Sequence, residues 1–132
     1  MPAKPVICRY LTYRMVTYMD DVLSRLPLRE PTFFILLGLS PGPKHGYAIL
    51  KEVEALSEGR LRLSTGTLYG AIKRLLDDGW IRRVEDPLPN GTERERKAYA
   101  LTEKGRRVLN AEIDRLRRLL TVVQAQAAEE TP

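Results

Sequence analysis

Two adjacent basic side chains, Lys73 and Arg74, lie in the segment STGTLYGAIKRLLDDGW, residues 64–80. Ammonium and guanidinium groups bind phosphate oxygens, and so do the free backbone N–H groups at a helix N-terminus. At about 100° per residue, the apolar side chains of this segment fall on one side of a helix and Gly70 falls on the other. A mid-helix glycine costs about 1 kcal/mol relative to alanine. We therefore expect Gly70 to allow close approach of a partner, and the neighbouring positive charges favour nucleic-acid phosphate.

The same residues have a second interpretation, in which the outward face of the helix is only solvated. Exposed lysines and arginines are common on surface helices, and a glycine there can be tolerated without any role. Tyr69, at the flank of the apolar stripe, can likewise be half-buried packing instead of a contact. The order of the surrounding helices and strands is needed to decide between these two interpretations.

Groups for catalysis or metal binding are scarce in this chain. It has one histidine, His45, and one cysteine, Cys8. A nucleophile triad or a zinc site needs more such side chains, and a single cysteine rules out an intrachain disulfide. There is no glycine-rich loop of the nucleotide-hydrolase type and no run of about 18 apolar residues to span a membrane. We expect no enzyme activity, no cofactor and no membrane partner, and we expect a cytoplasmic protein.

Length and charge favour one small basic domain. The chain has 132 residues, of which 43% are hydrophobic, and a formal net charge of +5 from 22 basic and 17 acidic residues. The apolar content suffices for one core, and the positive charge favours a polyanionic partner. Neither property identifies that partner.

Helix and strand signals follow one another along the chain. A helix is predicted to begin at Pro31, and the segment HGYAILKEVEAL predicts a second one. The segment of residues 64–80 is the third helix, with Ser64 or Thr65 as N-cap and Gly79 as the left-handed residue that ends it. The segments WIRRVE and ERKAYALT predict two strands joined by a turn that contains Asn-Gly.

The last segment predicts one long helix with Thr102 as its N-cap. Its apolar residues are separated by alternating intervals of four and three, which is the a/d seam of a coiled coil. A single small domain leaves part of so long a stripe uncovered, so we expect a homodimer. The predicted interface residues are Leu109, Ile113, Leu116, Leu120 and Val123.

Three helices followed by a hairpin are the arrangement of a winged helix-turn-helix domain, whose third helix enters the major groove. The expected fold class is mainly α with a small β-hairpin, as a winged helix-turn-helix domain plus a long C-terminal dimerisation helix. Residues 30–102 are expected to form the DNA-binding domain, and residues 103–132 the coiled-coil-like dimerisation helix and tail. Residues 1–29 are expected to be an N-terminal extension of uncertain structure that folding does not require.

Three segments, HGYAIL, STGTLYGAIKRLLDDGWI and YALTEKG, resemble in order and spacing the signature segments of PadR-like transcriptional regulators, in particular the smaller subfamily. The resemblance covers residues 31 to about 107. It implies a homodimeric, usually repressing, DNA-binding protein, and it places Thr67, Tyr69 and Lys73 where the family touches the DNA backbone. Some small members bind drugs at an aromatic residue of the dimer helix, but residues 103–132 contain no Phe, Trp or Tyr. The existence of a small-molecule effector is left open.

The function that follows is sequence-specific binding of double-stranded DNA by a homodimer on a two-fold symmetric operator. The alternative is a winged-helix module that binds a protein and not DNA, which the basic outward face of the third helix disfavours. The wing segment TERERK alternates acidic with basic residues, so we expect its grip on DNA to be weak. The predicted DNA-contacting residues are Ser64, Thr65, Gly66, Thr67, Tyr69, Gly70, Lys73 and Arg74 at the third helix and Arg94, Arg96 and Lys97 in the wing.

Overall fold

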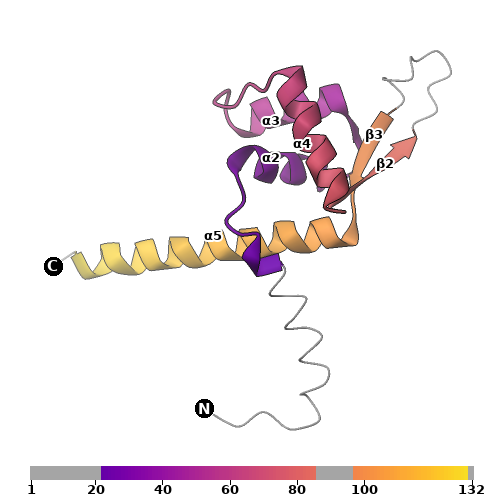
Figure 1. The fold of residues 1–132 in the computed structure, drawn as a ribbon. Helices are drawn as coiled ribbons and strands as arrows, with labels where there is room; N and C mark the ends of the chain where they lie inside the picture. The colour runs from indigo at the N-terminus through magenta and orange to yellow at the C-terminus, as the bar shows by residue number, and fades with distance from the viewer. Residues whose placement is uncertain (1–21, 86–96, 131–132) are drawn as a thin grey trace, which may run out of the picture.

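The computed structural model describes residues 22–85 and 97–130. These residues are mainly helical, with a small antiparallel sheet beside the helices and one long helix at the C-terminus (Figure 1). This confirms the predicted fold class, a winged helix-turn-helix domain followed by a long helix. The elements in chain order are α2 (Glu30–Leu39), β1 (Lys44–His45), α3 (Gly46–Leu56), α4 (Thr65–Asp77), β2 (Ile81–Glu85), β3 (Lys97–Leu101) and α5 (Glu103–Glu130).

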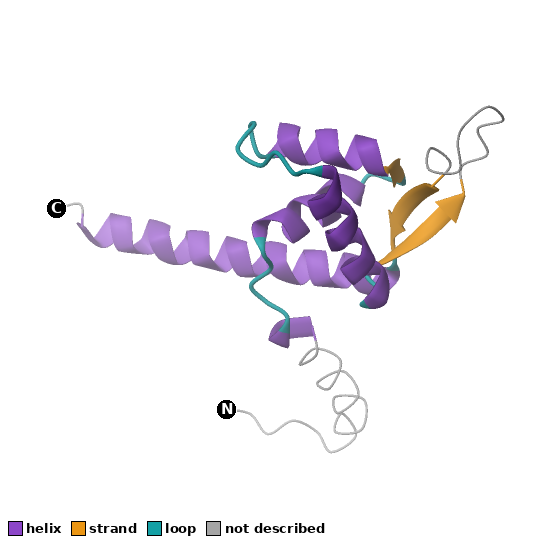
Figure 2. Ribbon diagram, turned by 45° about the horizontal axis from the view of Figure 1, so that its top comes forward, coloured by secondary structure: helices purple, strands orange, loops and turns teal. Residues whose placement is uncertain are grey.

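The sheet has three strands, one more than the predicted hairpin (Figure 2). β2 and β3 pair antiparallel along their whole length, as expected for the wing. The additional strand, β1, lies on the other edge of β3, with His45 opposite Ala98. A strand of two residues is too short to show a period-two pattern, so the sequence did not indicate it. The predicted Asn-Gly turn falls in residues 86–96, outside the described residues.

Helix α4 begins and ends where its capping residues predict. Ser64 is the N-cap, because its hydroxyl oxygen accepts a hydrogen bond from the backbone N–H of Thr67 at 3.1 Å. This decides between the two predicted caps. At the other end Gly79 has a φ of +75°, in the left-handed region that favours glycine.

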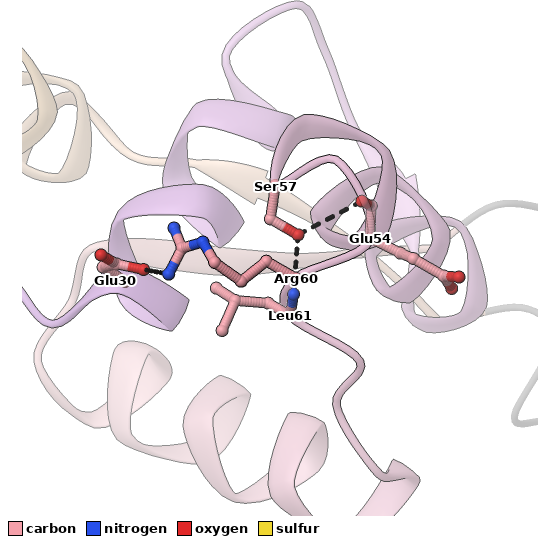
Figure 3. A network of polar contacts seen from close by, with 5 residues as sticks. All are labelled: Glu30, Glu54, Ser57, Arg60 and Leu61. Atoms are coloured by element: carbon pink, nitrogen blue, oxygen red, sulfur yellow. Dashed lines mark hydrogen bonds and ion pairs between the residues drawn. The ribbon is translucent and has the colours of Figure 1, made fainter.

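The turn that leads from α3 into α4 is held by side-chain contacts (Figure 3). The Ser57 hydroxyl donates to the carbonyl oxygen of Glu54 at 3.2 Å and accepts from the backbone N–H of Leu61 at 2.9 Å. Arg60 forms an ion pair with Glu30 at the start of α2. Because Ser57 is buried, these contacts fix the turn against the domain and set the direction in which α4 starts.

The core lies between α2, α3, α4, the sheet and the first turns of α5. Its largest buried side chains include Ile35, Leu36, Leu68 and Leu109. Only 2% of Leu109 is exposed, which corrects the expectation that this residue belongs to the dimer seam. The start of α5 packs on α2, so the domain itself already covers the first position of the heptad pattern.

Residues 22–29 pack against the domain, although the predicted domain begins at residue 30. Val22 belongs to the core and is 3% exposed. The backbone N–H of Leu28 donates to the buried carboxylate of Glu112 on α5 at 2.5 Å. The predicted boundary therefore divides residues that fold together. The sequence pattern did not predict the contacts of residues 22–29, because these residues show no helical or strand period.

A pair of truncations tests the contribution of this segment. A chain that starts at Met19 keeps residues 22–29 and is expected to melt at nearly the temperature of the full chain. A chain that starts at Glu30 loses the burial of Val22 and one partner of Glu112, so we expect it to be less stable by about 3 kcal/mol. Thermal denaturation followed by circular dichroism measures both. Equal midpoints for the two truncations would show that residues 22–29 contribute nothing.

Candidate nucleic-acid interface

The N-terminus of α4 is polar and exposed. Ser64, Thr65, Gly66 and Thr67 are all exposed residues. The first backbone bond of the helix joins the N–H of Leu68 to the carbonyl oxygen of Ser64 at 2.9 Å. The N–H groups of Thr65 and Gly66 come before this bond in the chain. Like the first N–H groups of every helix, they have no acceptor within the helix. A helix end of this kind can present N–H groups and hydroxyls to a phosphate oxygen.

One exposed side of α4, which we call the outward face, is formed by Gly66, Gly70, Lys73, Arg74 and Asp77. A β-carbon built at Gly66 or Gly70 would have no neighbouring atom within 4 Å. The packing of the protein itself therefore does not require a glycine at either position. The predicted exposure of Gly70 is confirmed, and the two glycines leave the backbone of α4 uncovered toward solvent.

Arg74 is also exposed, and it lies on the other side of Gly70 from Lys73, at the edge of the outward face. Its side chain lines a pocket together with Arg25 and Arg29 of the N-terminal segment. Neighbouring residues of a helix are about 100° apart, which separates Arg74 from Lys73. The two basic side chains that are adjacent in the sequence thus lie on either side of Gly70.

Tyr69 packs between α4 and the start of α3. It is half-buried, and a β-carbon built at Gly46 would lie 2.7 Å from its hydroxyl oxygen. Gly46 therefore leaves the space that the phenol occupies, which explains the glycine of the HGYAIL segment. The packing interpretation of Tyr69 is confirmed, and a contact between its hydroxyl and DNA stays a prediction.

A pair of phenols and one arginine connect α4 with the sheet. Burial raises the pKa of the Tyr99 phenol, nearby Tyr69 raises it further, and Arg83 acts in the opposite direction. Arg83 on β2 lies directly opposite Tyr99 on β3. Tyr69 of α4 and Arg83 of β2 thus both act on the Tyr99 phenol.

The structure adds exposed side chains that the sequence pattern did not single out. Arg82 and Arg83 are both exposed on β2. On α3 the exposed Tyr47 has the Lys51 nitrogen 5.5 Å from its ring centroid. Two adjacent arginines in WIRRVE were the available signal for the strand. In a strand with one buried face, buried and exposed side chains alternate, so the strand pattern does not predict that both arginines are exposed.

The wing residues divide into one that the structure describes and two that it does not. Lys97 is half-buried at the start of β3, opposite Glu85 of β2. Arg94 and Arg96 lie outside the described residues. Of the three predicted wing contacts, Lys97 is therefore the one whose position the described residues show.

The start of α5 holds the end of α4. The Thr102 hydroxyl donates to the carbonyl oxygen of Gly79 at 2.6 Å, and the Thr102 backbone N–H donates to that of Trp80 at 3.0 Å. A β-carbon built at Gly105 would lie only 1.9 Å from the Trp80 carbonyl oxygen. The helix thus approaches this backbone directly, which explains the glycine of the YALTEKG segment and fixes α4 relative to α5.

Within residues 22–85 and 97–130, no group of three or more His, Cys, Asp or Glu side chains could hold a metal ion. No helix in these ranges combines the length and the apolar character needed to cross a membrane.

Comparison with known protein families identifies the arrangement. Residues 35–111 match the model of the transcriptional regulator PadR-like family. The chain belongs to this family. The matched range runs from within α2 into α5 and includes all of α3, α4 and the sheet. PadR-like proteins are transcriptional regulators.

Solved structures of PadR-like proteins share the fold. A PadR family transcription regulator from Clostridium difficile R20291 aligns with a TM-score of 0.61 at 23% identity, over 75% of this chain and 99% of that chain. Bacillus subtilis PadR in complex with operator DNA aligns with a TM-score of 0.56 at 28% identity, over 66% of this chain and 47% of that chain. Both comparisons agree with a winged-helix domain that carries a long C-terminal helix.

A curated relative is similar over a comparable part of the chain. It is described as an uncharacterized 37.1 kDa protein in transposon TN4556 of Streptomyces fradiae, and it is 36% identical over 90 residues. The match covers 68% of this chain and 24% of the relative. The chain thus spans about a quarter of the length of this relative.

Proposed function

We propose that this PadR-like protein is a sequence-specific DNA-binding regulator that acts in the cytoplasm as a repressor. The observation that carries the proposal is the outward face of α4, where Gly66 and Gly70 leave the backbone uncovered beside Lys73. The operator complex of the similar Bacillus subtilis PadR supports it. In this arrangement α4 enters the major groove, and the wing lies over the neighbouring backbone or minor groove.

The proposed contacts are of two kinds. Polar groups at the start of α4 and basic side chains around it bind phosphates and position the protein, while the outward face approaches the base edges. The exposed arginines of β2 extend the basic surface toward the wing. The proposed contact residues are Ser64, Thr65, Gly66, Thr67, Tyr69, Gly70, Lys73, Arg74, Arg82, Arg83, Arg94, Arg96 and Lys97.

The second half of α5 supports the proposal of a homodimer. It projects beyond the rest of the domain and carries apolar side chains that are exposed, Leu120 at 56% (Figure 1). Exposed apolar stripes of this kind mark surfaces that another molecule covers. The interface proposed here omits the buried Leu109. Its residues are Ile113, Leu116, Leu119, Leu120 and Val123.

Replacement of Leu116 by aspartate is expected to weaken dimerisation by about a hundredfold or more, because a two-fold symmetric interface would bury the new carboxylate twice. Sedimentation equilibrium measures the change. Ala125→Asp adds the same charge on the opposite side of α5 and is expected to leave the dimer intact. An intact dimer of the Leu116 variant, or a monomeric parent protein, would remove α5 as the interface.

Selection of bound fragments from a random DNA library tests the proposed function. We expect a two-fold symmetric sequence with half-sites about 34 Å apart, one turn of DNA, because a symmetric dimer presents two α4 helices. Mobility shifts at increasing salt are expected to show a steep loss of affinity, as counterion release requires. If no fragment is retained even at low salt, the protein-binding alternative is favoured.

A further inference from the structure

A pocket lies on the Arg74 flank of α4, where the N-terminal segment meets the last turns of that helix. Its volume is about 330 Å³, at the lower end of the range found for small-molecule sites. Leu28 and Leu75 contribute apolar wall, and Trp80 also lines it. The pocket therefore combines apolar surface with the charged groups described next.

Three guanidinium groups line this pocket, those of Arg25, Arg29 and Arg74, and Asp78 is the single carboxylate among the lining residues. Asp78 is paired with Arg25 at 2.8 Å, and the same guanidinium lies 4.8 Å from the ring centroid of Trp80. In the described part of the chain, the Arg29 and Arg74 side chains form no ion pair. The pocket lining thus holds three positive groups and one negative group, which gives it a net positive charge.

Positive charges gathered around one cavity repel one another, and an anion placed between them removes that cost. Guanidinium groups bind phosphate and carboxylate oxygens with two parallel hydrogen bonds. We propose that this pocket binds a small organic anion through its phosphate or carboxylate group. Arg29 and Arg74 hold the charged group, and the apolar wall covers the rest of the molecule.

Such a ligand would also compete for Arg25, which now joins the N-terminal segment to Asp78 at the end of α4. The N-terminal segment is bound at its other side to α5, through Leu28 and Glu112. The proposed site therefore lies between α4, the helix that faces DNA in the proposed function, and the N-terminal segment that contacts α5. This position suits a ligand that alters how the two helices are connected.

Trp80 is the one tryptophan of the chain, so tryptophan fluorescence of the full-length protein reports on this pocket. We expect citrate or inorganic phosphate to change the emission saturably, relative to sodium chloride at the same ionic strength. The tighter of the two probes identifies carboxylate or phosphate as the preferred group. Arg29→Gln and Arg74→Gln are each expected to weaken binding about tenfold, because each removes a charged hydrogen-bond donor.

Arg118→Gln is the matched control, since Arg118 is exposed on α5 and does not line the pocket. This variant is expected to bind the probes as the parent protein does. The proposal is overturned if neither probe changes the emission beyond the chloride control, or if the two pocket variants respond as the parent does. Because the readout contains no DNA, its failure is distinguishable from a failure of the proposed DNA binding.

Discussion

Replacement of Gly70 by glutamate is expected to lower the affinity for operator DNA by about a hundredfold or more, without lowering the melting temperature. The new side chain would bring bulk and negative charge to a face that approaches a phosphate backbone, with one charge per roughly 1.7 Å of duplex. Inside the protein nothing opposes it, because no atom lies within 4 Å of a β-carbon at this position. Glutamate is also the better helix former. Mobility shifts at constant salt and thermal melting measure the two effects.

Gly70→Ala is the matched control for this result. It adds one methyl group and no charge, and we expect it to raise stability by up to about 1 kcal/mol through helix propensity. Its DNA affinity is expected to fall far less than that of the glutamate variant. If Gly70→Glu shifts the operator as well as the parent protein does, the outward face of α4 does not dock on DNA, and the protein-binding alternative becomes the stronger one.

Replacement of Gly105 by alanine is expected to lower the free energy of unfolding by about 3 kcal/mol. The added methyl group would lie 1.9 Å from the Trp80 carbonyl oxygen, so α5 has to move away from the end of α4. Overpacking of this kind costs about 1–3 kcal/mol, and the two Thr102 hydrogen bonds at the same junction weaken with it. Urea denaturation followed by circular dichroism measures the loss.

Comparison with Gly70→Ala shows whether the effect of Gly105→Ala comes from packing and not from helix propensity. Both substitutions replace a helical glycine by alanine, so helix propensity acts in the same direction in both. We expect opposite signs for the change in stability, because only Gly105 meets a backbone atom. An equal gain in stability for both variants would show that α5 does not press against the Trp80 backbone.

Local patterns in the sequence determined helices α2, α3, α4 and α5 and the two wing strands of this domain to within a few residues, but not β1. Ser64 and Gly79 marked the ends of α4 correctly, because capping acts through backbone groups within one helical turn. The exposure of Gly70 followed from the 3.6-residue period of its helix. Three short segments in order also sufficed to predict the PadR-like family, which the family match confirms.

The tertiary structure decided which surface each residue serves. Leu109 and Leu116 occupy equivalent places in one heptad pattern, yet the first is buried in its own domain and the second is exposed. Arg25 and Asp78 form an ion pair across 53 residues of sequence. Gly70 and Gly105 look alike in the sequence, and only the packing of α5 on Trp80 distinguishes them. Contacts between segments far apart in the chain produce these differences, and a local period records only the face of a helix, not what covers it.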